Sequence, residues 1–158
     1  MFYVIVLASI GGSVGLDQLT KWLALQHLQT EPVTIIPGFF ELTYVQNSGM
    51  GFGMLSGYRW VFVAVTAVVM ALFLWALLFS NLRSSKLLCF SLVLVIAGGI
   101  GNMIDRIALG YVVDFIDFCL INFAIFNVAD SFVTVGACLM IFALVYEIVI
   151  ECKKAKKK

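Results

Sequence analysis

GYVVDFIDFCLINFAIFNVADS, residues 110–131, sets three aspartates in a run that is otherwise almost wholly apolar. These acids are Asp114, Asp117 and Asp130. An ionised carboxylate in apolar surroundings is costly unless it is paired, hydrogen-bonded or shifted in pKa. In a membrane chain, such acids are candidates for a functional site. We take Asp114 and Asp130 as a candidate catalytic pair, although composition alone would let Asp117 replace Asp114.

The composition is that of an integral membrane protein. Of 158 residues, 63% are hydrophobic and 12% charged, and the mean hydropathy is +1.08. A soluble domain is about half apolar and about a quarter charged. The single histidine and the lack of a basic stripe argue against nucleic-acid binding. The four cysteines show no CxxC or Cys/His pattern, so we expect neither a metal site nor a disulfide framework.

Four long apolar segments predict one membrane domain over residues 1–158, since a membrane-spanning helix needs about 20 residues. The expected helices cover residues 2–21, 60–80, 87–105 and 126–150. The expected fold class is an all-α membrane bundle with a small extracytoplasmic β-rich segment between the first two helices. Residues 39–46 are rich in aromatic and β-branched side chains and predict an antiparallel ribbon there. Gly11 and Gly15 form a GxxxG that would permit close helix contact, and a mere lack of side chain at these positions is an equally good interpretation.

Lysine and arginine predict the orientation of these helices. The loop after the second helix carries Arg83 and Lys86, and the tail, residues 151–158, carries five lysines. With four helices these regions share one side, which is then cytoplasmic, as are both termini. Residues 26–58 and 107–125 lie outside. Within the latter, YVVDFIDF fits a strand or a short interfacial helix equally well.

On this topology the polar residues gather near the outer leaflet. Seven of the nine acids fall on the outer side. The residues that converge at the outer helix ends and loops are Asp17, Lys21, Asn47, Asn102, Asp105, Arg106, Asp114, Asp117, Asn127 and Asp130. This distribution predicts a polar site at one depth of a four-helix bundle.

Paired carboxylates in such a site predict the chemistry of an aspartic peptidase, which needs no cofactor. Two nearby carboxylates share one proton, so the ionised one can activate water while the protonated one polarises a carbonyl. The chain has no GxSxG and no HExxH. Other interpretations stay open. Asp17 and Lys21 fit a helical ion pair with a structural role. Intramembrane acids also occur in small proton-coupled transporters or channels, and in structural subunits whose acids pair with a partner.

Five motifs occur in order on the four segments: DQLTKW (17–22), NSGMGFG (47–53), GGIGNMIDR (98–106), VVDF (112–115) and FNVADS (126–131). Together they closely resemble bacterial lipoprotein signal peptidase (signal peptidase II). This resemblance implies an aspartic endopeptidase of the bacterial cytoplasmic (inner) membrane, without a cofactor. Its substrates would be prolipoproteins, cut before a cysteine that carries a diacylglyceryl group.

The resemblance also implies roles for individual residues. Asp114 and Asp130 would be catalytic, which makes Asp117 a bystander. Substrate and inhibitor contacts would come from Asn47, Gly49, Asn102, Arg106 and Asn127. Supporting roles would fall to Asp17, Lys21 and Asp105. The expected partners are diacylglyceryl-modified prolipoproteins, membrane lipid and globomycin-type inhibitors, and we expect a monomer. The chief alternative remains the proton-coupled transporter or channel.

Overall fold

The structure is a computed structural model that describes residues 1–49, 58–80, 85–121 and 123–155. Its described residues form four helices long and apolar enough to cross a membrane, together with one small antiparallel sheet. The order is α1 (Phe2–His27), β1 (Val33–Ile36), β2 (Phe40–Asn47), α2 (Arg59–Phe79), α3 (Lys86–Ala108), β3 (Val112–Asp117), the short 3-10 helix η3 (Cys119–Ile121) and α4 (Val128–Ala155). The expected membrane bundle with a β-rich outer segment is thereby confirmed.

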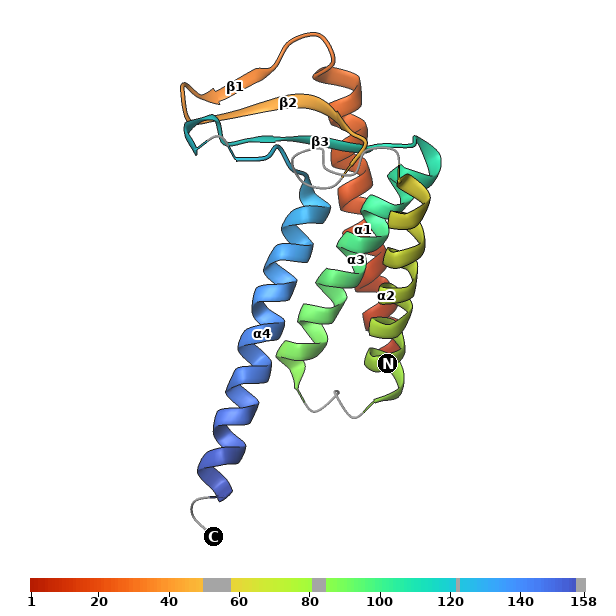
Figure 1. Cartoon of the computed structure of the whole chain (residues 1–158), viewed down its shortest axis with the longest axis vertical. Helices are drawn as coiled ribbons and strands as arrows, with labels where there is room; N and C mark the ends of the chain where they lie inside the picture. The colour runs from red at the N-terminus through yellow and green to blue at the C-terminus, as the bar shows by residue number, and fades with distance from the viewer. Residues whose placement is uncertain (50–57, 81–84, 122, 156–158) are drawn as a thin grey trace.

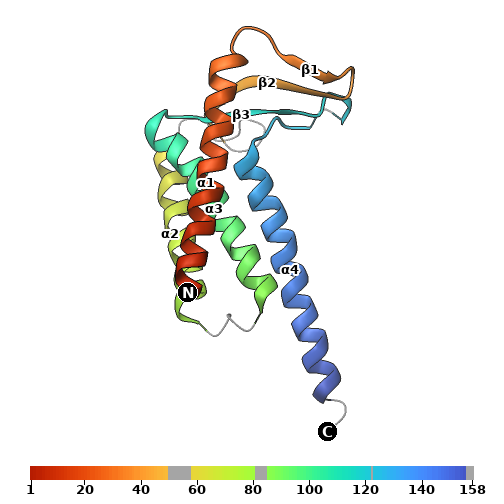
Figure 2. The same cartoon turned by 180° about the vertical axis from the view of Figure 1, so that it is seen from behind.

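The sheet covers one end of the helical bundle, and the start of α1 and the end of α4 lie at the opposite end (Figures 1 and 2). Its strand order is β1-β2-β3, with antiparallel neighbours throughout. We expected the β structure to lie between the first two helices. The third strand instead comes from the segment after α3, so the sheet extends beyond that region. The ambiguous run YVVDFIDF is therefore a strand, because β2 offers it a pairing edge.

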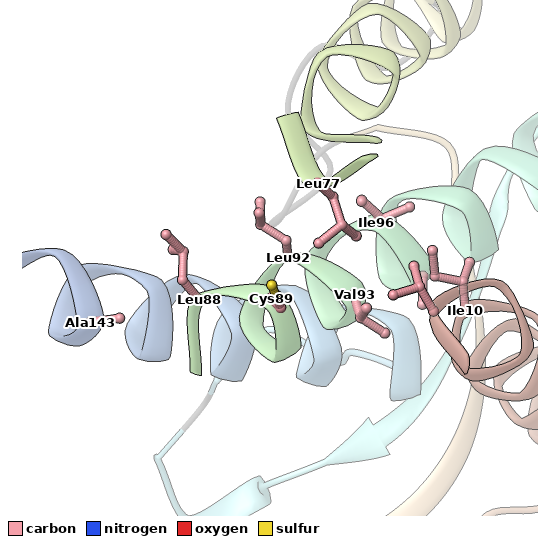
Figure 3. Packing of buried hydrophobic residues seen from close by; sticks show 10 residues of the cluster. Ile10, Leu77, Leu88, Cys89, Leu92, Val93, Ile96 and Ala143 are labelled. Carbon is pink, nitrogen blue, oxygen red and sulfur yellow. The ribbon is translucent and has the colours of Figure 1, made fainter. Parts of the chain in front are cut away.

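α3 is the central helix of the bundle and packs against α1, α2 and α4. An apolar cluster fills the space around it, with side chains from all four helices (Figure 3). Ile10 of α1, Leu77 of α2 and Ala143 of α4 all contribute to this cluster, and Leu92 and Ile96 of α3 lie at its centre. Nearly every residue in the middle of α3 is consequently buried.

Three glycines in GGIG of α3 allow the close packing of its three neighbours. A β-carbon at Gly98 would meet the backbone of α4 at Ala129, and one at Gly99 would meet Met70 of α2. A β-carbon at Gly101 would lie 2.5 Å from a carboxylate oxygen on α1. Each glycine costs a helix about 1 kcal/mol relative to alanine, and close helix contact offsets that cost.

The GxxxG of α1 does not make a helix contact. A β-carbon at Gly11 or Gly15 would meet no described atom within 4 Å. Of the two interpretations of this motif, a mere lack of side chain therefore fits the described residues. The neighbouring helix α3 lies against other positions of α1, among them Val6 and Ile10.

Helix ends differ from the expected ones for local reasons. α1 continues to His27, beyond the predicted end at residue 21, because the first proline after it is Pro32. Its last two turns extend beside the sheet (Figures 1 and 2). α4 begins at Val128, two residues later than predicted, and runs into the basic tail as far as Ala155. The side chain of Asn127 explains the later start, because it accepts a hydrogen bond from the backbone N–H of Asp130 at 3.0 Å.

α2 presents a continuous apolar stripe to its surroundings. One row of exposed residues recurs every three or four positions and consists of Val61, Val65, Val68, Leu72, Trp75 and Phe79. Only Leu77 of this helix is buried. A soluble protein rarely exposes an apolar surface of this extent, so the stripe fits contact with lipid.

Parts of the predicted motifs lie outside the described residues. They are the NSGMGFG motif from Met50 onward, Arg83 in the loop after α2, and the three lysines at 156–158.

Candidate active site

The predicted site residues meet where the sheet covers the bundle. β2 and β3 carry Asn47 and Asp114, and α3 carries Asn102. Asn127 and Asp130 lie at the start of α4. The register of the sheet contributes to this meeting, because the last residues of β2 pair with the first residues of β3.

Asp114 is almost completely buried, with 2% of its surface exposed. Two asparagine amides donate hydrogen bonds to it, one to each carboxylate oxygen. The Nδ2 of Asn47 lies 2.9 Å from Oδ2, and the Nδ2 of Asn127 lies 2.6 Å from Oδ1. Both oxygens are therefore held in place by neutral donors.

Asp130 is held at the first turn of α4 by a reciprocal cap. Its Oδ2 accepts from the backbone N–H of Asn127 at 3.2 Å, while its own N–H donates to the side-chain oxygen of Asn127. This is the geometry of a capping box, with aspartate in the place of the usual glutamate. Its second oxygen accepts from the amide of Asn102 at 2.7 Å. FNVAD thus encodes both a helix start and the orientation of a carboxylate.

The chain between Asp114 and Asp130 folds back through a short backbone bridge. Ile116 and Phe126 pair in antiparallel fashion, and their two backbone hydrogen bonds measure 2.8 and 3.1 Å. The ring of Phe118 stacks on Phe126 at 5.9 Å between ring centroids. Because this bridge closes the loop, the two aspartates reach the same side of the sheet.

Both aspartates line a single cavity of about 460 Å³. Its polar wall includes Asn47, Asn102, Arg106 and the two carboxylates. Much of the remaining wall is apolar and comes from Val112, Phe123, Ala124, Ile125, Phe126 and Val135. Such a cavity can hold a molecule that combines a polar backbone with a large apolar part.

Arg106 connects this cavity to the loop that follows β2. Its guanidinium donates to the carbonyl oxygen of Gly49 at 3.0 Å and lies 5.4 Å from the ring centroid of Phe62. The N–H of Gly49 in turn donates to the side-chain oxygen of Asn47 at 3.0 Å. Gly49 therefore contacts two of the residues that line the cavity.

Burial raises the pKa of Asp114 from its ordinary value to about 6. The hydrogen bonds from Asn47 and Asn127 and the positive charge of Lys21 act in the opposite direction, and the negative charge of Asp130 adds to the rise. Burial dominates because removing a carboxylate from water disfavours its ionised form. Asp114 therefore exchanges its proton close to neutral pH.

A second polar cluster lies directly behind the cavity. Lys21 is buried between Asp17 and Asp105, with Nζ at 2.9 and 3.1 Å from their oxygens. A third hydrogen bond, of 2.8 Å, runs from Nζ to the side-chain oxygen of Asn102. Since lysine can only donate, this contact fixes which end of the Asn102 amide faces Asp130.

Sequence reasoning missed Gln18 in this cluster. Its amide donates to Asp17, to the carbonyl oxygen of Gly101 and to Asp105, at 3.2, 3.2 and 3.0 Å. Gln18 lies inside the DQLTKW motif, but only Asp17 and Lys21 of that motif are charged, and the sequence reasoning considered charged residues first. The helical periodicity of α1 would have been the signal, since Gln18 is three residues before Lys21 and shares its face.

Asp117 lies apart from the cavity. It is opposite Glu41 in the sheet, three residues beyond Asp114 on β3, so its side chain points to the other face. Among the described residues, Glu41, Asp117 and Cys119 form a group whose potential metal-binding atoms all lie within 4.8 Å of one another. Partly exposed acids of this kind are common without a metal ion.

Solved structures share this architecture. One bacterial membrane enzyme structure superimposes with a TM-score of 0.86 at 30% identity, covering 94% of this chain and 92% of that one. Another gives a TM-score of 0.81 at 31% identity, covering 91% and 94%. The fold is therefore that of a bacterial membrane enzyme.

The family follows from sequence comparison. The model of signal peptidase II matches residues 9–146. A lipoprotein signal peptidase of Streptococcus thermophilus is 46% identical over 132 residues, which cover 83% of this chain and 86% of the relative. One from Halothermothrix orenii is 42% identical over 145 residues, covering 91% and 94%. The chain belongs to the signal peptidase II family of aspartic peptidases, and the transporter or channel alternative finds no support.

Proposed function

We propose that this protein removes signal peptides from prolipoproteins, with Asp114 and Asp130 as its catalytic pair. The observation that carries the proposal is that both carboxylates line one cavity and each is held by asparagine amides. Family membership supports the reaction class. The residue roles rest on the contacts.

In this mechanism the pair shares one proton and activates a water molecule. Asp114 is the protonated member, because burial raises its pKa to about 6, and it donates a hydrogen bond to the carbonyl oxygen of the scissile bond. Asp130 is the base. It lies in the first turn of α4, where the helix dipole and backbone N–H groups stabilise a negative charge. It takes a proton from the water, which attacks the carbonyl carbon, and a proton then passes to the leaving amine.

The other cavity residues bind the substrate in this proposal. Arg106, which already donates to the backbone carbonyl of Gly49, offers donors for peptide carbonyls. Asn47, Asn102 and Asn127 orient the carboxylates with their amide groups. The apolar part of the cavity suits a lipid-modified cysteine just after the cleaved bond, and it equally suits the lipopeptide inhibitor globomycin.

We further propose that both termini are cytoplasmic and that the site lies near the outer leaflet. Lys86, Lys153 and Lys154 lie at the end of the bundle opposite the sheet, and cytoplasmic ends are enriched in lysine. The apolar stripe of α2 fits contact with lipid over its whole length.

Cleavage of a defined peptide tests the proposal. The purified protein is incubated with a diacylglyceryl-modified lipobox peptide, and Asp114→Asn and Asp130→Asn are compared with Asp117→Asn. We expect the first two variants to lose activity by about four orders of magnitude or more, as when catalytic residues that act as a unit are removed. Asp117→Asn, the same change outside the cavity, should cleave normally. Retained cleavage in either of the first two variants would refute the pair.

A further inference from the structure

The Lys21 cluster, which we define as Asp17, Gln18, Lys21 and Asp105, touches the backbone next to both catalytic aspartates. Oδ1 of Asp17 accepts a hydrogen bond of 2.8 Å from the N–H of Ala129, the residue before Asp130. Oδ2 of Asp105 accepts one of 3.1 Å from the N–H of Val113, the residue before Asp114. The two supporting acids therefore hold equivalent points on α4 and β3.

Lys21 and Gln18 join these two contacts to each other. Lys21 forms ion pairs with both Asp17 and Asp105, and the amide of Gln18 donates to both as well. Lys21 and Gln18 therefore form two separate bridges, each of which restrains the distance between Asp17 and Asp105. The distance between the N–H groups of Ala129 and Val113 is then set by the same bridges.

A third connection reaches the catalytic side chains themselves. The Nζ of Lys21 donates to the side-chain oxygen of Asn102, and the amide of Asn102 donates to Asp130. The same oxygen accepts from Asn127, whose amide also donates to Asp114. All three partners of Lys21 therefore lead to the catalytic pair, two through the backbone and one through asparagine side chains.

Close packing leaves this cluster little room to relax. Asp17 is fully buried and Lys21 and Asp105 are only 3% exposed. A β-carbon at Gly101 would collide with Asp17, so the glycine permits the approach of α1. Buried, fully paired polar networks are rigid, because any displacement leaves a donor or acceptor unsatisfied.

We infer that the Lys21 cluster is a positioning device that sets the separation of Asp114 and Asp130, with Gln18 as its second bridge. The inference rests on the proposed catalytic pair and adds a role for residues that do not line the cavity. A shared proton and a bound water require the two carboxylates to stay at one separation. A misplacement of about 1 Å in an active site can lower its rate roughly a hundredfold.

Gln18→Met tests the inference without disturbing the ion pairs. Methionine keeps the length and approximate volume of glutamine but removes its donors. We expect kcat on the diacylglyceryl-modified lipobox peptide to fall roughly tenfold to a hundredfold, while KM stays within about twofold because no substrate contact is lost. The unfolding midpoint in detergent is measured in parallel, and activities are expressed per folded molecule.

Gln26→Met is the matched control, because Gln26 lies on the same helix and is exposed. It should leave kcat, KM and the unfolding midpoint unchanged. A wild-type kcat in Gln18→Met, or a loss that disappears after correction for the folded fraction, would overturn the positioning role alone. Failure of the wild-type protein to cleave the peptide would instead remove the proposed function, and this inference with it.

Discussion

Two pairs of aspartates lie next to each other beneath the sheet, and they are held in opposite ways. Three of the four are buried, and Asp130 is partly buried. Asp17 and Asp105 enclose the ammonium group of Lys21. Asp114 and Asp130 accept hydrogen bonds from neutral asparagine amides and from the backbone, and they line a cavity. Among the described residues, the first pair is in direct contact with a full positive charge, whereas the hydrogen-bond donors that touch the second pair are neutral.

This difference separates a structural carboxylate pair from a reactive one. The oxygens of Asp17 and Asp105 are taken up by Lys21, Gln18 and backbone N–H groups, and neither side chain lines the cavity. Amide donors orient a carboxylate and still allow it to be protonated. Two acids that look equally costly in an apolar sequence can therefore have unlike roles, and the partner atoms decide which role each has.

Removing the cation should have the largest effect on the stability of the fold. Lys21→Met leaves Asp17 and Asp105 buried without their counter-charge. Breaking a buried ion pair in this way costs about 3–5 kcal/mol. We therefore expect a large drop in the unfolding free energy, measured by denaturant titration in detergent.

Removing a carboxylate from the reactive pair should not lower the unfolding free energy. Asp114→Asn removes a buried carboxylate that has no ion-pair partner among the described residues, so the unfolding free energy should stay the same or rise. Similar losses for Lys21→Met and Asp114→Asn would show that the two pairs are held alike. That outcome would contradict the proposed difference between the structural pair and the reactive pair.

Packing next to the structural pair should have an intermediate effect. The β-carbon of Gly101→Ala would lie 2.5 Å from Oδ2 of Asp17, which must shift away from Lys21. Overpacking of a buried site typically costs about 1–3 kcal/mol. Gly11→Ala is the control, because it meets no described atom within 4 Å and gains about 1 kcal/mol of helix propensity. Equal unfolding midpoints for the two variants would contradict the packing of α1 on α3.

The smallest effect should be a displacement of the pH profile. With Asp114 as the protonated member of the pair, kcat/KM should decline as the pH rises through its pKa of about 6. The hydrogen bond from Asn47 lowers that pKa, so Asn47→Leu should move this decline to higher pH. Gln46→Leu, a neighbouring change on β2, should leave it in place. A shift to lower pH in Asn47→Leu would contradict the assigned proton.

The raised pKa of Asp114 should also make the unfolding free energy depend on pH. The pKa of Asp114 is higher in the folded protein than the ordinary value of 3.8, so between pH 3.8 and about 6 the folded state binds more protons than the unfolded state. The contribution of Asp114 to the unfolding free energy then falls as pH rises through that window. Asp114→Asn should abolish this fall, which denaturant titrations at several pH values would detect.

The spans and the strand before residue 47 could be read from the sequence because hydropathy and β-propensity are local properties. The third strand could not, since VVDFID becomes a strand only where β2 offers it an edge. The apolar stretches of the second and third helices also look alike in hydropathy, yet α3 is largely buried and α2 faces outward. The glycines at 98, 99 and 101 set α3 apart, and their partners are far away along the chain.

For this protein the sequence by itself determined membrane insertion, the number of spans and the list of polar residues at the outer ends. Each of these depends on residue types within one segment. Residue types left Asp114 and Asp117 open, and the motif resemblance favoured Asp114. The tertiary structure decided that Asp114 lines the cavity with Asp130 and that Gln18 belongs to the cluster behind it. Such facts depend on strand register, loop closure and helix packing, which bring together atoms separated by tens of residues.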